Sequence, residues 1–99
     1  MSYEMTLDGA THEMIPRIIG KNGDTILKVK RDAWTMYKSY QRGKDQGDMK
    51  LFIKIKKEDA GVSAEIVTNS DTMRKFAIQS LRTNVKAIVD KSRGNTFHL

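Results

Sequence analysis

The sequence of 99 residues contains no cysteine and only one proline. Without cysteine, the chain can form neither a disulfide nor a thiolate metal site. No apolar run approaches the roughly 20 residues that a membrane-spanning helix needs. The first 20 residues carry Glu4, Asp8 and Glu13 and lack the apolar segment of a signal peptide. We therefore expect an intracellular protein, cytoplasmic or nuclear, with no membrane partner.

Motifs of the common enzyme classes are also missing. Gly20–Thr25 places a lysine between two glycines, but a nucleotide-binding P-loop requires Gly-x-x-x-x-Gly-Lys-Ser/Thr. The sequence has no activated-serine motif, no metal-ligand spacing and no convincing pair of carboxylates. His12 and His98 lie far apart in the chain and are interpreted as surface residues. The sequence predicts that the protein is not an enzyme, with no catalytic residue, no metal and no cofactor.

The charge of the chain is positive and unevenly distributed. Eighteen Lys and Arg against twelve Asp and Glu give a formal net charge of +6. Residues 15–57 hold 12 of the basic residues and 4 of the acidic ones, whereas the rest of the chain holds 6 and 8. Polyanions are therefore the first partners to consider, and the basic segment is where they should bind.

The basic segment contains the motif around which we interpret the chain, Ile-Ile-Gly-Lys-Asn-Gly-Asp-Thr-Ile at residues 18–26. Two glycines in residues 20–23, here called the glycine turn, allow the backbone to reverse and a ligand to approach closely. The turn exposes the N-terminus of a following helix, whose N–H groups and dipole favour phosphate. Lys21 adds a cation at the tip, and Arg17 lies about one helical turn before it. This stretch is predicted to hold a nucleic-acid backbone.

Hydrophobic spacing predicts a single α+β domain over residues 1–99, with a core over about 3–92 and a frayed tail at 95–99. Alternation predicts strands, and apolar residues three to four positions apart predict helices. Asn69 and Ser70 are expected to cap the last helix, and Glu58–Gly61 to turn a hairpin. The expected elements are a strand at 3–7, helices at about 11–19 and from 24, strands at 51–57 and 63–68, and a helix at about 71–92.

Residues 35–49 allow two interpretations. Residues 35–41 could extend the second helix or form an extra strand, since their aromatic side chains suit either. Residues 42–48 are expected to form a polar loop. Trp34, Tyr37 and Tyr40 have the spacing of a buried helical stripe, so packing is favoured over stacking on bases.

The sequence resembles the KH (hnRNP K homology) family. The resemblance is carried by Arg17–Ile26, by Val29 one helical turn later, and by Ile66–Ser70, which resembles the last strand of the family running into its C-terminal helix. It spans about residues 3–90 and favours the type I arrangement, β-α-α-β-β-α. It implies a three-stranded antiparallel sheet packed on three helices, with an extended helix or extra strand at 35–49 as this chain's departure from the pattern.

The resemblance also implies a function, which is to clamp the backbone of about four single-stranded nucleotides in a groove. RNA is the expected partner, and DNA is the alternative. The glycine turn would hold phosphates, apolar residues would line the groove floor, and flanking cations would assist. Lys54 is expected either to touch phosphate or to guard a strand edge. The predicted nucleic-acid-binding residues are Arg17, Ile19, Gly20, Lys21, Asn22, Gly23, Ile26, Val29, Lys30, Arg31 and Lys54.

The sequence also allows a second function, as an alternative to nucleic-acid binding. A fold of this kind could serve as a protein-interaction or dimerisation module with little nucleic-acid binding. The expected C-terminal helix of roughly 22 residues is longer than a three-stranded sheet needs, and the aromatic segment 34–40 has no assigned role. The partner would then be a second copy of the chain or another RNA-binding protein.

Overall fold

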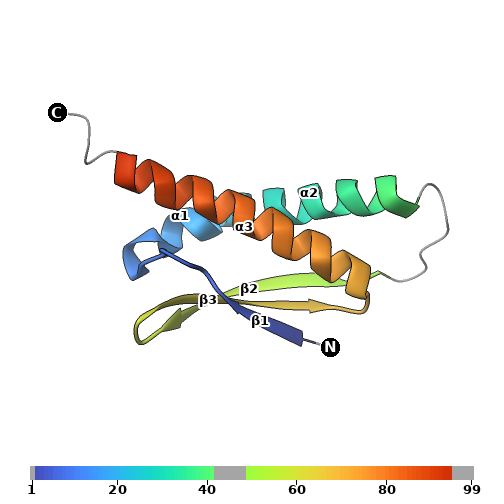
Figure 1. Ribbon diagram of the computed structural model, residues 1–99, viewed down its shortest axis with the longest axis horizontal. Coiled ribbons are helices and arrows are strands. Elements are labelled where there is room, and N and C mark those ends of the chain that lie inside the picture. The colour runs from blue at the N-terminus through green and yellow to red at the C-terminus, as the bar shows by residue number, and fades with distance from the viewer. Residues whose placement is uncertain (1, 42–48, 95–99) are drawn as a thin grey trace.

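The computed structural model describes residues 2–41 and 49–94. Within them, three α-helices cover one face of a three-stranded antiparallel sheet (Figure 1). This confirms the predicted α+β class. The elements in chain order are β1 (Ser2–Thr6), the 3-10 turn η1 (His12–Met14), α1 (Ile15–Ile19), the 3-10 turn η2 (Lys21–Gly23), α2 (Asp24–Gln41), β2 (Leu51–Glu58), β3 (Gly61–Thr68) and α3 (Asp71–Gly94).

Strand β3 is central in the sheet, and β1 and β2 form its two edges. The predicted hairpin is present, because Glu58 at the end of β2 pairs with Gly61 at the start of β3. Side chains alternate between the two faces of a strand, and Val62, Ala64 and Ile66 of β3 are buried under the helices. The residues of β2 that share the opposite, helix-free face are Phe52, Lys54, Lys56 and Glu58, which pair with Val67, Glu65, Ser63 and Gly61 of β3.

The core lies between the sheet and the antiparallel pair α2 and α3 (Figure 1). Ile18, Val29 and Leu81 from the three helices are fully buried in it. The hydroxyl of buried Ser80 donates a 3.0 Å hydrogen bond to the carbonyl oxygen of Val29, which satisfies a polar group inside this contact. The buried stripe of α3 keeps helical spacing over most of the helix: Met73, Ala77, Leu81, Val85 and Val89.

Residues 35–41 are helical, because α2 continues to Gln41. Packing explains the extension. Tyr37 is buried, and its ring lies edge-on to that of Trp34 with centroids 6.1 Å apart. Tyr40 contacts Phe76 of α3 in the same way, at 5.9 Å. The loop predicted at 42–48 and the frayed tail predicted at 95–99 lie outside the described residues.

The predicted start of the last helix agrees with the structure, whereas the predicted bounds of the first helix do not. The Ser70 hydroxyl accepts a 3.2 Å hydrogen bond from the N–H of Met73, as expected for the cap of α3. The helix expected at 11–19 is instead the turn η1 followed by the five residues of α1. Pro16 lies in the first turn of α1, where its missing N–H leaves no hydrogen bond unmade.

The core predicts a contrast between two leucine truncations. Leu81→Ala should destabilise the protein by about 2–5 kcal/mol, because it removes a fully buried side chain and leaves a cavity. Leu27→Ala makes the same chemical change on α2 at a side chain that is 51% exposed, and should change stability by less than about 0.5 kcal/mol. Urea unfolding followed by tryptophan fluorescence measures both. Equal losses would contradict the assigned core.

Candidate nucleic-acid interface

The glycine turn connects α1 to α2 through three residues with positive φ. Gly20 has φ 84° and ψ 161°, and Asn22 and Gly23 have φ 57° and 78°. The Gly20 conformation lies in a region of φ and ψ that is essentially restricted to glycine. A Cβ there would also clash with the backbone nitrogen of Thr25 and lie 2.5 Å from its Oγ1. A Cβ on Gly23 would meet no atom within 4 Å, so the outer side of the turn is open.

The glycine turn presents polar groups to solvent at the start of α2. The side chains of Lys21 and Asn22 are exposed. The first N–H groups of a helix have no acceptor within it, and the helix dipole adds partial positive charge at that end. Asp24, in the first turn of α2, also benefits from that dipole. The N–H groups of Gly23 and Asp24 already donate to the carbonyl oxygens of Gly20 and Lys21. An anion that approaches the turn therefore meets a cation, a side-chain amide and the positive end of the helix dipole.

The apolar residues predicted to line a groove differ in their exposure. Ile19 is 37% exposed and Ile26 is half-buried, so both offer surface to a ligand. Val29 is fully buried, and its carbonyl oxygen accepts the bond from Ser80 of α3. Val29 therefore belongs to the core between α2 and α3 and not to the floor of a groove, which corrects its predicted placement.

The predicted cations lie in different parts of the surface. Arg17 of α1 donates from Nη1 to the Ser92 hydroxyl of α3 at 3.1 Å, which directs its guanidinium toward the end of that helix. Arg31 is exposed on α2. Lys54 is exposed on the helix-free face of the sheet, where it pairs in register with Glu65. The structure thus does not gather all predicted cations at the glycine turn.

Lys30 extends from α2 to the edge strand β2. Its Nζ lies over the ring of Phe52, 5.7 Å from the ring centroid, which is within the range of a cation–π interaction. Phe52 belongs to the helix-free face of the sheet and is 59% exposed. Phe52 is not among the nucleic-acid-binding residues predicted from the sequence. Its position as the one aromatic residue among the outward lysines of an alternating strand was the available signal.

Two lysines of β2 differ in their availability to a ligand. The Nζ of Lys56 lies 2.6 Å from Oε1 of Glu4 on β1. This hydrogen bond and the charge of Glu4 raise the pKa of the Lys56 ammonium above its ordinary value. Among the described residues, the ion pairs involve Lys56 and Arg74 but not Lys54. Lys54 is therefore the better placed of the two lysines to bind an anion.

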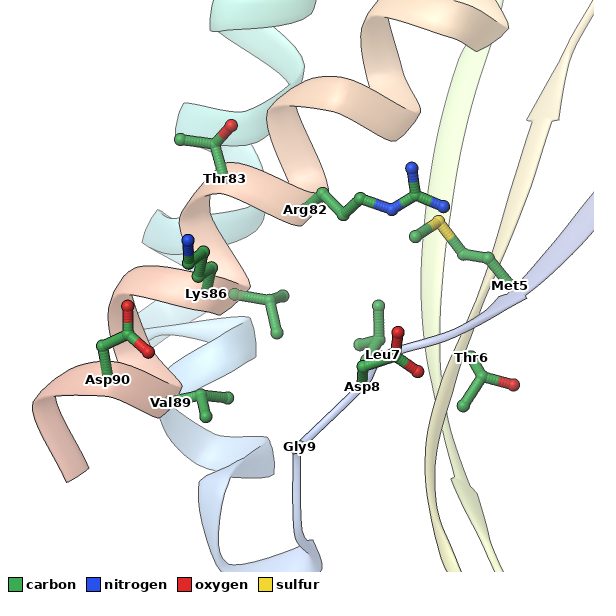
Figure 2. A pocket seen from close by; sticks show the side chains of 11 residues that line it. Met5, Thr6, Leu7, Asp8, Gly9, Arg82, Thr83, Lys86, Val89 and Asp90 are labelled. Carbon is green, nitrogen blue, oxygen red and sulfur yellow. The ribbon is translucent and has the colours of Figure 1, made fainter. Parts of the chain in front are cut away.

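A separate cavity of about 540 Å³ lies between the end of β1 and α3 (Figure 2). Its apolar lining comes from Met5, Leu7, Val85 and Val89, and charged side chains from both elements surround it, namely Asp8, Arg82, Lys86 and Asp90. Two cations and two carboxylates leave it without a net charge. Because β1 is the sheet edge opposite β2, this cavity is distinct from the surface formed by Lys30 and Phe52.

Comparisons of the chain with known protein families, with curated proteins and with solved structures gave no match. Within residues 2–41 and 49–94, no helix is both long enough and apolar enough to cross a membrane. What the candidate interface does must therefore be inferred from its residues and geometry.

The geometry of the glycine turn predicts different costs for two alanine substitutions. Gly23→Ala should cost about 1–2 kcal/mol of stability, because it forces a Cβ into a left-handed conformation without a clash. Gly20→Ala should cost about 3 kcal/mol or more, because it adds the clash with Thr25 to a conformation restricted to glycine. Urea unfolding of both variants tests this order. A smaller loss for Gly20→Ala would contradict the described turn.

Proposed function

We propose that the chain binds single-stranded nucleic acid, RNA in the first place, and that the glycine turn holds the phosphate backbone. One observation carries the proposal: a turn with three positive φ angles presents exposed Lys21 and Asn22 at the start of α2 and is open on its outer side. Phosphates suit such a site because it offers a helix dipole, a cation and a side-chain amide together. The excess of basic residues in segment 15–57 favours the same class of ligand.

The proposal includes the finer assignment of the fold as a KH domain of type I. Two features support it, namely the motif Arg17–Ile26 at the junction of α1 and α2, and a C-terminal helix that begins three residues after β3 ends. In this assignment the bases lie toward the exposed apolar surface of Ile19 and Ile26, while Lys21 and Asn22 contact phosphates. About four nucleotides would be bound.

A site of this size should bind weakly by itself. Useful affinity would then come from repeated sites on one target or from a second binding protein. Each phosphate neutralised on a single strand should contribute about −0.7 to the slope of log affinity against log salt concentration. Measurable salt dependence is therefore part of the proposal, and an interaction that does not respond to salt would count against it.

The features that motivated a protein-interaction module have contacts within the chain. Helix α3 is buried as far as Val89 and bonded to Arg17 at Ser92, so its length serves the packing of the domain. Tyr37 and Trp34 pack against each other on α2. Tyr40 remains 63% exposed beside Phe76. An interaction role therefore has less support than nucleic-acid binding, and it is what a complete absence of binding would favour.

The proposed function predicts that reversal of charge at the glycine turn weakens binding. A double variant, Lys21→Asp with Asn22→Asp, places two carboxylates where phosphates are expected and leaves both glycines in place. We expect it to weaken binding at least about tenfold and to reduce the salt slope, because phosphate contacts are lost. Fluorescence anisotropy with randomised single-stranded RNA and DNA pools measures both quantities.

A matched control lowers the net charge equally at another place. Thr83→Asp with Lys86→Asp makes the same change of three charge units on α3, beside the cavity of Figure 2. This control should retain most of the native affinity. If both double variants lose binding equally, only the net charge matters and the proposed site is wrong. If the native protein binds neither pool, the proposed function is wrong. Circular dichroism and urea unfolding establish that each variant is folded.

A further inference from the structure

We propose that Phe52 is a base-stacking platform that extends the nucleic-acid site beyond the glycine turn. The bound strand would leave the turn, pass Lys30 of α2 and place one further base on the exposed ring at the edge of β2. This inference rests on the proposed function. It adds a residue, a direction along the protein surface and a contribution to affinity that does not depend on charge.

The surroundings of Phe52 identify it as more than an isolated exposed side chain. Single exposed hydrophobic residues are common and by themselves indicate nothing. Phe52, however, has the ammonium of Lys30 5.7 Å from its ring centroid, and exposed Lys50 and Lys54 lie two positions before and after it. We call Lys30, Lys50, Phe52 and Lys54 the β2 edge patch. An aromatic ring surrounded by cations is the usual arrangement for binding single strands without regard to sequence.

The charge on the helix-free face would keep a polyanion on the β2 side of the sheet. The described lysines of this face are on β2, where Glu58 lies at the far end of the strand from Phe52, whereas Glu65 lies on β3 and Glu4 on β1. Oε1 of Glu4 also forms an ion pair with Nζ of Lys56 at 2.6 Å, so the carboxylate on β1 neutralises one lysine of β2. Lys54 has no ion pair among the described residues. A nucleic-acid strand is therefore attracted at the β2 edge and repelled toward β1.

The β2 edge patch is continuous with the proposed phosphate site. Gly23 immediately precedes α2, and Lys30 lies seven residues after it on that helix. At 1.5 Å per residue this is a distance of about 10 Å along the axis. Even at the compact spacing of about 3.4 Å per phosphate, a strand of four nucleotides would extend from the glycine turn to Lys30. Helices α1 and α2 both contact β2, so no other element has to be crossed. Val67 of β3, which pairs with Phe52 of β2, enlarges the apolar surface beside the ring.

The test compares substitutions that remove or keep the ring. Phe52→Leu removes it and keeps an apolar side chain, Phe52→Trp keeps a larger ring, and Tyr40→Leu removes another exposed ring as the control. Affinities for randomised RNA pools of four and eight nucleotides are measured by fluorescence anisotropy at several salt concentrations. Phe52→Leu should bind the longer pool about five- to a hundredfold more weakly than the native protein does, the range expected for one lost stack.

Three further results are expected if the ring stacks on a base. Affinity of Phe52→Leu for the four-nucleotide pool and its salt slope should stay native, because no phosphate contact is lost. Phe52→Trp and Tyr40→Leu should bind like the native protein. The chain has a single tryptophan, so in a Trp34→Phe background Phe52→Trp supplies the only indole. Its fluorescence should be quenched by the eight-nucleotide pool.

Each contrary result overturns a different statement. If Phe52→Leu binds the longer pool as the native protein does while the double variant of the glycine turn loses binding, the stacking inference fails and the proposed function stands. If Phe52→Leu also lowers the salt slope, Phe52 acts by positioning Lys30 and not by stacking. If the native protein binds neither pool, both proposals fail, and the β2 edge patch becomes a candidate protein contact.

Discussion

The fold depends on a reversal of the chain within four residues at the glycine turn. Ile18 before the turn and Val29 after it are both fully buried, so α1 and α2 must enter one core from the two sides of the turn. Gly20 makes this possible through a backbone conformation that other residues avoid, next to the backbone of Thr25. Because the residues on both sides of the turn are packed in the core, its tip projects outward with Lys21 and Asn22 exposed.

The residues that stabilise the fold and those that would bind a ligand are largely different. Val29, Leu81 and Ser80 join α2 to α3, and none of them offers surface to a partner. Lys21, Asn22 and Phe52 are exposed and can be changed at little cost in buried contacts. Gly20 belongs with the residues that stabilise the fold, because a side chain there would clash with Thr25 inside the turn. This separation makes binding and stability measurable independently in most variants of the site.

Sequence periodicity was sufficient to predict the strands, the hairpin and the last helix, because spacings of two and of three to four residues report burial directly. It could not decide residues 35–41, since aromatic side chains suit both a strand and a helix and the contact of Tyr40 with Phe76 joins distant elements. The same limit applies to the site. The glycine turn is formed by residues adjacent in the chain, so the sequence was sufficient to predict it. Tertiary packing, in contrast, produces the burial of Val29, the bond from Arg17 to Ser92 and the approach of Lys30 to Phe52.

The glycine turn and the β2 edge patch would contribute to binding in physically different ways. Contacts of Lys21 with phosphate would release counterions and would weaken as salt rises. Stacking on Phe52 would remove apolar surface from water and add contacts between the ring and a base. Salt hardly affects either contribution. At low ionic strength the positive segment 15–57 would capture strands of any sequence, and at higher ionic strength the share of the ring would grow. A domain with a net charge of +6 would gain selectivity from such a division, because a flexible single strand with unstacked bases would satisfy both contacts while a duplex would satisfy only the first.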